Sequence, residues 1–474
     1  MIDLKHLREN PEHYQRGADR KHAKVDIGRV VELDARKRDL MTRRESLKAE
    51  QNAASKAMGP RMGQLAGRIK KAVGAEASRL QAEMDELKAG PAKLKGEIER
   101  LESELAGLEP ELETLLLMIP QPPDPDVPDG PGAEGNVEIR RWSPPGFDPA
   151  KPFAGQKGFN AKSHEALAEV HDLVDFERGV KLSGSRSYVL TGDGFRLHQA
   201  ILRYAFDQIV AQGFTPVSAP SIVRENAMVG TGFFPGGRDQ TYEVGIHEAD
   251  EAGQRQWEAD GYLTGTGEVG LMGFHMDEIV DEDDLPIKLC TLSPCYRREA
   301  GAAGKDTAGL YRVHYFEKVE QVVICKADEA ESRQWHRKMI TYVESLLQSL
   351  ELPYRLLQCC AGDLGQKNAD MIDVECWMPS RGEVDKDGVP TGDWGETHSA
   401  SRLYDFQCRR LNLRYRPGGA NGKGATTFCH SLNNTVLASP RFLIPLIEMN
   451  QNADGSVTIP EVLRPYMGGQ ARIG

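Results

Sequence analysis

Cysteine is scarce in this chain of 474 residues: there are 8, all between Cys290 and Cys429, and no two have Cys-x-x-Cys spacing. This pattern argues against a disulfide framework or a zinc ribbon, and we expect buried, reduced thiols. No apolar run approaches the roughly 18 residues needed to cross a bilayer, and residues 1–20 are too charged for a secretory signal. A glycine-rich dinucleotide fingerprint is also missing. We therefore expect a cytoplasmic protein with no membrane association.

The charge of the chain is unevenly distributed. Its length and its hydrophobic content of 39% predict two or three domains with a sizeable core. The net charge of −12 argues superficially against a nucleic-acid partner. However, residues 36–79 carry 12 Lys or Arg and 4 Asp or Glu, a balance of +8, so the rest of the chain carries −20. Taken alone, such a basic segment is more often a solvated helix face than an RNA-binding surface.

A heptad pattern predicts a long helical hairpin at about residues 30–117. In its second helix, apolar residues recur at alternating steps of four and three from Leu80 to Leu115, which is typical of a coiled coil. The first helix, about 30–58, has polar residues at alternate seam positions, so looser packing is expected there: Lys37, Arg44 and Gln51. We expect residues 59–74, which start with Gly-Pro, to form the bend, and Pro91 to kink or interrupt the second helix.

A segment rich in Pro, Asp and Gly follows the hairpin and cannot continue a helix. We assign residues 1–120 to an N-terminal domain, 121–136 to a linker and 137–474 to a second domain. Short strands alternate with amphipathic helices in this last part of the sequence. It is therefore predicted to be an α+β domain built on an antiparallel sheet.

The most informative stretch runs from Ser293 to Glu320. It predicts two strands joined by a Gly-rich loop, with Arg297 near the end of the first strand and Arg312 at the start of the second. Two guanidinium groups on a rigid hairpin suit phosphate or carboxylate groups. Phe316 and Glu320 lie at even intervals from Arg312, which places all three on one face of the sheet. This arrangement suits a nucleotide; a solvated hairpin with surface ion pairs is the alternative.

This stretch resembles motif 2 of the seryl-tRNA synthetases, which are class II aminoacyl-tRNA ligases. Other segments are similar to that family in the same order along the chain: residues 213–220 to motif 1, 262–269 to the serine-pocket loop, 428–449 to motif 3, and the ending 460–469. The resemblance implies a class II antiparallel sheet flanked by helices and an N-terminal antiparallel coiled-coil arm. It also implies a homodimer formed through motif 1. The Thr-Gly-Glu sequence of the pocket loop matches the common zinc-independent branch, so no zinc is expected.

The implied activity has two steps. L-Serine is activated by ATP to seryl-adenylate, and the seryl group is then transferred to the 3′ end of tRNA(Ser), and of tRNA(Sec) where that tRNA is present. Positioning and charge neutralisation do most of the work in the first step, and no protein nucleophile is required. ATP is therefore the expected nucleotide substrate, and Mg²⁺ the expected metal ion.

The resemblance also implies roles for individual residues. Arg297 bridges the serine carboxylate and the α-phosphate, and Arg312 holds the γ-phosphate. Glu299 faces the adenine amine, while Phe316 and Arg441 stack on the two sides of the ring. The residues implied in catalysis are Arg297, Glu299, Arg312 and Arg441, and those implied in Mg²⁺ binding are Glu396 and Ser399.

The serine pocket is expected to combine polar partners with a tight fit. Its implied residues are Thr266, Glu268, Arg297, Glu320, Asn433 and Thr435. Thr435 and Glu320 match the partners of the hydroxyl and ammonium groups, and Glu268 supports the loop. Cations on a rigid arm suit an RNA helix, whose shape and backbone are what proteins mainly contact. The long variable arm of the tRNA is thus expected to contact some of the basic residues Arg36, Arg43, Arg44, Lys48, Arg61, Arg68, Lys70 and Lys71.

Some features depart from the family pattern. Gly265 and Gly267 predict a more flexible serine loop, and a polar insertion of unassigned role occupies residues 234–261. Ser439-Pro440 predicts a helix start, but Pro445 is expected to disturb the helix that carries Arg441.

The sequence leaves two alternative functions. An amino acid:carrier protein ligase is one, although such relatives lack the arm. The other is a catalytically inactive synthetase-like coiled-coil RNA-binding protein. Such a protein is expected to have lost active-site residues, whereas this sequence retains all of those that the resemblance implies in ATP binding: Arg297, Glu299, Arg312, Phe316, Glu396 and Arg441.

Overall fold

The computed structural model describes residues 2–249, 255–300, 308–419, 422 and 424–474. The chain forms two compact units, one made of residues 3–15 and 24–119 and the other of Ile2, of residues 16–23 and of the chain from Pro120 onward. Among the helices in these ranges, none is both long enough and apolar enough to cross a membrane.

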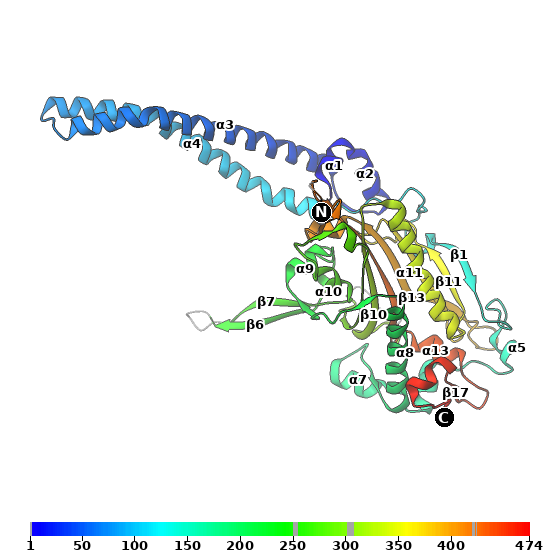
Figure 1. Cartoon of the computed structure of the whole chain (residues 1–474). Coiled ribbons are helices and arrows are strands. Elements are labelled where there is room, and N and C mark those ends of the chain that lie inside the picture. The colour runs from blue at the N-terminus through cyan, green and yellow to red at the C-terminus, as the bar shows by residue number, and fades with distance from the viewer. Residues whose placement is uncertain (1, 250–254, 301–307, 420–421, 423) are drawn as a thin grey trace. The chain divides into compact units, whose positions relative to one another are not determined.

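The first unit is dominated by two long antiparallel helices, α3 (Ile27–Ile69) and α4 (Ala75–Met118), which lie side by side along their length (Figure 1). Short helices α1 (Leu4–Glu9) and α2 (Pro11–Arg20) precede them. The heptad pattern predicts the inner face of α4 well, since the buried residues are Leu80, Met84, Ile98, Leu101, Leu105, Leu108, Leu112 and Leu116. Leu87, Leu94 and Leu115, which also belong to the heptad pattern, are only partly buried, and Leu116 is buried although it lies outside that pattern.

The prolines of this helix pair do not break it, contrary to the sequence-based expectation. Helix α3 runs through Pro60, so that the bend is limited to residues 70–74, and α4 continues through Pro91 and Pro110. A helical proline costs a backbone hydrogen bond and clashes with the preceding turn. Neighbouring turns remain packed: near the bend, Leu65 joins Leu80 and Met84 in one apolar cluster. Packing against the partner helix therefore outweighs the tendency of proline to interrupt a helix.

The second unit is built on an eight-stranded sheet. Neighbouring strands are antiparallel except for the edge pair β9 and β4. In spatial order, the strands are β1 (Val137–Trp142), β11 (Tyr354–Gln358), β12 (Asp370–Met378), β13 (Asp393–Tyr404), β16 (His430–Ser439), β10 (Tyr315–Cys325), β9 (Ile287–Tyr296) and β4 (Thr215–Pro216). The predicted α+β class and antiparallel sheet are confirmed.

Helices α8 (Gly192–Ala211) and α11 (Glu329–Ser349) pack against the central strands of the sheet (Figure 1). Successive side chains along β10 point to opposite faces of the sheet, and the two faces have different surroundings. Val319 and Val323 belong to the main core, together with residues of α8 and α11. Phe316 and Lys318, at even positions, instead approach a cavity. The sheet thus buries one set of side chains and presents the other to a ligand.

Shorter elements surround the sheet. The helices are α5 (Phe153–Lys157), α6 (His164–Val170), α7 (Phe176–Ser183), α9 (Glu225–Gly230), α10 (Glu268–Gly273), α12 (Phe406–Arg410) and α13 (Leu443–Met449). The strands are β2 (Val174–Asp175), β3 (Val189–Leu190), β5 (Ile222–Val223), β6 (Glu243–Ala249), β7 (Arg255–Leu263), β8 (Ile279–Asp281), β14 (Arg414–Arg416), β15 (Thr427–Phe428), β17 (Val457–Thr458) and β18 (Arg472–Ile473). The polar insertion contains the antiparallel pair β6 and β7, and its residues 250–254 lie outside the described ranges.

Candidate active site

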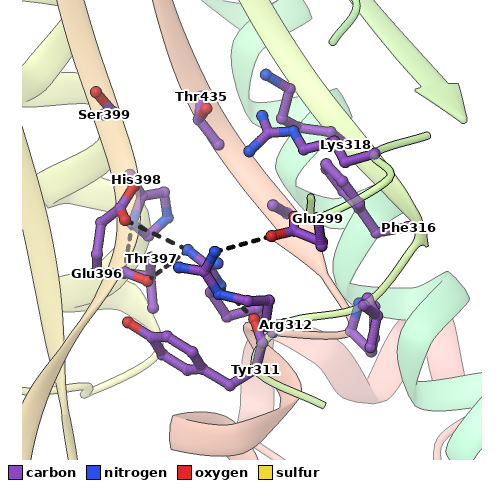
Figure 2. A pocket seen from close by; sticks show the side chains of 15 residues that line it. Glu299, Tyr311, Arg312, Phe316, Lys318, Glu396, Thr397, His398, Ser399 and Thr435 are labelled. Carbon is purple, nitrogen blue, oxygen red and sulfur yellow. Dashed lines mark hydrogen bonds and ion pairs between the residues drawn. The ribbon is translucent and has the colours of Figure 1, made fainter. Parts of the chain in front are cut away.

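Two adjoining cavities at the sheet share five lining residues. These are Arg297, Glu299, Arg312, Glu396 and Arg441, all of them singled out from the sequence. They come from three distant parts of the chain, the β9–β10 connection, β13 and the end of β16. Figure 2 shows several of them around the first cavity, together with Phe316, Ser399 and Thr435. The three arginines therefore converge.

The β9–β10 hairpin carries two of these arginines just outside its strands. Arg297 follows the last residue of β9, and its backbone N–H donates to the carbonyl oxygen of His314 at 2.9 Å. Arg312 precedes β10, which begins at Tyr315. Arg312 therefore does not lie on a strand face, contrary to the sequence-based prediction, although Phe316 and Glu320 do share a face of β10. The loop residues 301–307 lie outside the described ranges.

Glu299 and Arg312 form an ion pair in the cavity. The distance between Glu299 Oε2 and an Arg312 terminal nitrogen is 2.8 Å (Figure 2). Glu299 has a φ of 52°, in the left-handed region that residues with a side chain rarely adopt. Such backbone strain is concentrated at functional sites, where the surrounding structure holds it in place. The carboxylate is thereby held beside the guanidinium group.

Arg441 is fixed by contacts with the opposite side of the cavity. Its Nε donates to the carbonyl oxygen of Tyr311 at 2.8 Å, and its terminal nitrogen lies 3.5 Å from Glu396 Oε2. The guanidinium carbon also lies 4.4 Å from the centre of the Tyr311 ring, a cation–π arrangement. Tyr311 was not predicted as a site residue; its position next to Arg312 in the motif was the available signal.

Arg441 does not lie on a helix, which corrects the sequence-based prediction. Strand β16 ends at Ser439, and α13 begins only at Leu443. Pro445 therefore falls in the first helical turn, where backbone N–H groups have no partner within the helix. This position explains why the proline is tolerated.

Arg297 connects the cavity with the loop before α10. Its Nε donates to the carbonyl oxygen of Gly265 at 3.2 Å, and its guanidinium carbon is 5.2 Å from the centre of the Phe316 ring. Gly267 is closely packed, because a Cβ at this position would lie 2.4 Å from a Thr291 methyl group. Close packing therefore accounts for glycine at position 267, where the sequence had suggested only flexibility.

Three polar side chains meet beneath this loop: Thr266, Lys318 and Glu320, all buried. Thr266 Oγ1 donates to Glu320 Oε2 at 3.0 Å and accepts from Lys318 Nζ at 2.7 Å. Lys318 also forms an ion pair with Glu320. Sequence reasoning missed Lys318, although it lies between Phe316 and Glu320 at the same even spacing along β10.

The remaining residues predicted to bind serine occupy three different places. Thr435 lines the first cavity. Asn433 lies two residues earlier on β16 and is buried, but it lines neither of the two shared cavities. Glu268 points away from the cavity, since its two carboxylate oxygens accept from Lys367 Nζ at 2.6 Å each and one also accepts from Gln407 at 2.7 Å. Its position fits a supporting role for the loop.

Strand β13 contributes the oxygen ligands expected for a metal ion. Glu396 and Ser399 line the first cavity, and Ser399 is paired with Asp373 across the β12–β13 ladder. Burial and the negative charge of Glu396 raise the pKa of Asp373 well above its usual range. Its Oδ1 has no hydrogen-bond partner among the described residues. A set of carboxylate and hydroxyl oxygens fits Mg²⁺, which prefers such hard ligands.

A further group of potential ligand atoms adjoins Asp373. Atoms of Cys359, Asp363 and Asp373 lie within 4.8 Å of one another. Burial raises the pKa of the Cys359 thiol, and a protonated thiol is a poor metal ligand. All eight cysteines are buried and free, as the sequence predicted.

The two histidines near the site have structural contacts. His398 is buried, its Nδ1 lies 2.8 Å from Thr397 Oγ1, and burial lowers its pKa to about 3. His314 Nδ1 lies 2.9 Å from the carbonyl oxygen of Arg297. Both histidines are therefore packed or hydrogen-bonded within the protein.

The eight basic residues of the helix pair that were predicted to contact tRNA fall into two groups. Several form ion pairs, including Lys48 with Glu102 at 2.8 Å and Arg61 with Glu83 at 2.9 Å; the other paired cations are Arg36, Arg43 and Arg44. Arg68, Lys70 and Lys71, at the bend, make no ion pair with any residue that the structure describes. Their charges are thus not neutralised by neighbouring carboxylates.

The antiparallel sheet and its convergent arginines define the catalytic core of a class II aminoacyl-tRNA synthetase. A family model described as the tRNA synthetase class II core domain (G, H, P, S and T) matches residues 251–450, and one described as the seryl-tRNA synthetase N-terminal domain matches residues 1–123.

Comparisons over the full length narrow this class to one family. The chain is 38% identical to the serine–tRNA ligase of Deinococcus radiodurans, covering 100% of this chain and 99% of the relative. It is 40% identical to that of Thermomicrobium roseum, with 100% and 95% covered. The crystal structure of Pyrococcus horikoshii seryl-tRNA synthetase complexed with ATP matches with a TM-score of 0.78 and 33% identity, covering 100% of this chain and 99% of that chain. The chain belongs to the seryl-tRNA synthetase family.

Proposed function

We propose that this protein activates L-serine with ATP and transfers the seryl group to the 3′ end of tRNA(Ser). Its membership of the family over the full length makes it a serine–tRNA ligase of class II. The observation that carries the assignment to this cavity is the convergence of Arg297, Arg312 and Arg441 on it. We extend the proposal to tRNA(Sec) in cells that contain this tRNA, and we propose a cytoplasmic location.

ATP binding uses the cationic lining of the cavity. Arg297 contacts the α-phosphate and the serine carboxylate, and Arg312 contacts the γ-phosphate in exchange for its ion pair with Glu299. Glu299 is then free to accept a hydrogen bond from the adenine amine, with Phe316 and Arg441 on the two faces of the ring. This arrangement neutralises charge on the phosphates and aligns the serine carboxylate for in-line attack, without a protein nucleophile.

Serine selection uses the buried polar side chains next to Arg297. Glu320 binds the serine ammonium, Thr435 contacts the hydroxyl group, and Thr266 and Asn433 complete the pocket. Without the hydroxyl group, alanine leaves these buried polar groups unpaired, while the extra methyl of threonine must be excluded by steric contact. Lys318, which contacts both Thr266 and Glu320, holds them in place in this scheme.

Mg²⁺ fits the oxygen ligands of β13. Glu396 and Ser399 hold it in this proposal, and the ion supplies additional positive charge beside the phosphates of ATP. Burial, and after it the negative charge of Glu396, raise the pKa of Asp373, so a cation at this site would offset charge that is already unfavourable there. We assign no role to zinc.

The helix pair binds the long variable arm of the tRNA. Arg68, Lys70 and Lys71 are its best candidates for phosphate contact, because their charges are unpaired among the described residues. Dimerisation through residues 213–220 follows the family resemblance, and we include a homodimer in the proposal.

Aminoacylation of total tRNA tests the function. The full-length protein should charge tRNA with serine in an ATP-dependent reaction. A variant lacking residues 31–112 should still form seryl-adenylate, measured as serine-dependent ATP–pyrophosphate exchange, but should not charge tRNA. Failure of the full-length protein to charge any tRNA with serine would contradict the proposal. Loss of both activities in the variant would mean that the arm is also needed for the fold.

A further inference from the structure

The loop between β11 and β12, residues 359–369, connects the serine-binding loop with the N-terminal segment of the chain. On its inner side, Lys367 donates to both carboxylate oxygens of Glu268. On its outer side, Lys21 donates to three of its backbone carbonyl groups. Neither lysine was singled out by the motifs of the sequence.

The contact of Lys367 with Glu268 fixes the loop that contains Thr266. Both side chains are largely buried, and the Lys367 ammonium group also lies 4.0 Å from the centre of the Phe233 ring. The backbone N–H of Glu268 donates to Thr266 Oγ1 at 3.3 Å, and that hydroxyl group contacts Glu320. A buried carboxylate that loses its cation is strongly destabilised. Removal of Lys367 should therefore disturb Thr266.

Lys21 matches the three carbonyl oxygens by its chemistry. Its ammonium group has three N–H donors, and Nζ lies 2.9 Å from the carbonyl oxygen of Gly365, 3.4 Å from that of Gln366 and 2.5 Å from that of Asn368. These carbonyl groups flank Lys367 on both sides. A side chain that holds the residues before and after Lys367 limits the positions that its ammonium group can take.

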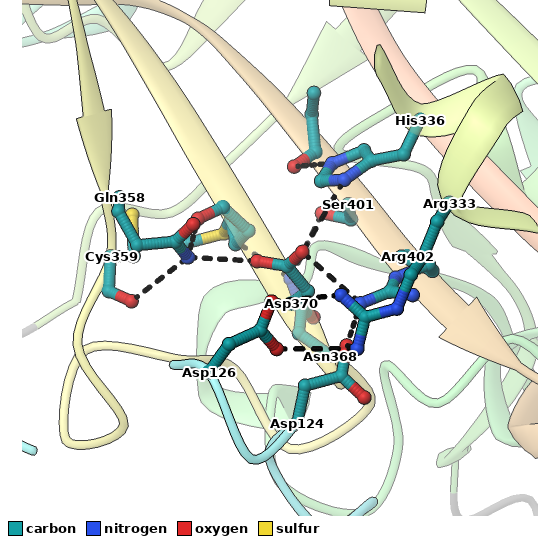
Figure 3. A network of polar contacts seen from close by, with 12 residues as sticks. Asp124, Asp126, Arg333, His336, Gln358, Cys359, Asn368, Asp370, Ser401 and Arg402 are labelled. Atoms are coloured by element: carbon teal, nitrogen blue, oxygen red, sulfur yellow. Dashed lines mark hydrogen bonds and ion pairs between the residues drawn. The ribbon is translucent and has the colours of Figure 1, made fainter. Parts of the chain in front are cut away.

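Other contacts attach the rest of this loop to rigid parts of the second unit. The backbone N–H of Gln121 donates to the Gln366 carbonyl oxygen at 2.9 Å. Asn368 Nδ2 donates to Ser401 Oγ on β13 at 2.9 Å, beside the network around Asp370 and Arg402 (Figure 3). The loop is thus held from several sides, and Lys21 contacts residues both before and after Lys367.

We infer that Lys21 and Lys367 are positioning residues for serine, acting in series through the 359–369 loop and Glu268. Neither side chain touches the substrate in this scheme. Serine binding then depends on a lysine near the N-terminus, well apart in sequence from the motifs of the catalytic core. This inference rests on the proposed function of the serine pocket and adds a means by which the N-terminal segment influences it.

The test measures KM for serine and for ATP by pyrophosphate exchange, which requires no tRNA. Lys367→Met keeps the aliphatic stem and should raise KM for serine about tenfold, and Lys21→Met should raise it about threefold, each with KM for ATP nearly unchanged. Because both act through one loop, the double variant should show about the same KM for serine as Lys367→Met, rather than the product of the two effects.

Arg20→Met is the matched control. Arg20 precedes Lys21 but contacts the linker, donating to Asp129 at 2.6 Å and to the Val127 carbonyl oxygen at 2.6 Å. Its KM for serine should equal that of the wild type. If Lys21→Met fails to fold, Lys21→Gln, which retains two donors, should still raise KM for serine, by a smaller factor.

Two outcomes for KM of serine would overturn the inference. One is an unchanged KM for serine in the folded Lys21 variant, and the other is a double variant whose effects multiply. A parallel rise in KM for ATP would also count against it, because this would indicate general damage to the fold. Absence of serine-dependent exchange in the wild-type protein would refute the proposed function itself, which is a distinguishable result.

Discussion

Glu317 and Glu320 lie three positions apart on β10 and face opposite sides of the sheet. Glu320 contacts Thr266 in the candidate serine pocket, whereas Glu317 contacts His198 of α8 at 2.6 Å. In the proposed function, the same side-chain chemistry therefore serves substrate binding on one face and the attachment of a helix on the other. This pair allows a substitution in the site to be compared with a matched one outside it.

Glu320→Ala should abolish serine-dependent pyrophosphate exchange, because the serine ammonium group loses its carboxylate and the buried Lys318 loses its partner. Glu317→Gln on the same strand should keep exchange within about twofold of the wild type. Wild-type exchange rates in Glu320→Ala would refute the assignment of the pocket.

Glu317 also predicts a pH dependence of stability. The hydrogen bond from His198 lowers the pKa of its carboxyl group from the usual 4.5. A lowered carboxyl pKa contributes stability that is fully present above the unfolded-state pKa and is lost as the pH falls through the folded-state value. The stability difference between wild type and Glu317→Gln, from urea denaturation, should thus be constant above about pH 5 and shrink below pH 4.5. A difference that grows on acidification would contradict this account.

Individual site residues differed in how well the sequence predicted them. Arg297, Glu299, Arg312 and Arg441 were found because each belongs to a motif with fixed spacing. Lys367 was not found, because its importance arises from a contact with Glu268 across 99 sequence positions, which no local pattern encodes. Contacts of this kind become visible only once the fold is known.

The α3–α4 pair shows what an element's pattern predicts and what it omits. Heptad spacing predicted the buried face of α4, since burial follows the helical repeat. The effect of Pro60 and Pro91 was predicted wrongly, because a proline rule considers one helix alone, whereas the partner helix holds the neighbouring turns in place. Similarly, Pro445 was expected to disturb a helix that carries Arg441. The helix α13 begins only at Leu443, so that Pro445 lies in its first turn.

The cations at the bend should contribute most to tRNA binding. Lys70→Glu combined with Lys71→Glu should raise KM for tRNA at least about tenfold and reduce the salt dependence of binding, because unpaired cations release counterions from phosphates. KM for serine should stay unchanged in pyrophosphate exchange. Arg61→Ala is the comparison, with a smaller effect expected because Arg61 is already paired with Glu83. Equal effects of both variants would contradict the distinction between paired and unpaired cations.

The second unit is tied together by buried charge as well as by its apolar core. Arg402 of β13 is fully buried and forms ion pairs with Asp124, from the segment after α4, and with Asp370 of β12 (Figure 3). Arg333 of α11 lies 3.3 Å from the same Asp124 carboxylate. The sequence did not predict this network, because its members are distant along the chain and belong to no motif.

Arg402→Met should destabilise the protein by about 3–5 kcal/mol, since it leaves buried carboxylates without their cation. Arg178→Met provides the control: the Arg178–Asp175 pair is exposed, and such pairs contribute about 0–1 kcal/mol. Chemical denaturation measures both changes. Similar small effects for the two variants would show that the buried network does not stabilise the unit.

Pyrophosphate exchange by the full-length protein with each of the standard amino acids measures most directly whether this site selects serine. The convergence of three arginines beside a small buried polar pocket predicts exchange with serine, and at least about a hundredfold lower kcat/KM with alanine and threonine. Arg312→Ala should lose the serine-dependent exchange. Equal exchange with another amino acid, or no exchange with serine, would contradict the account.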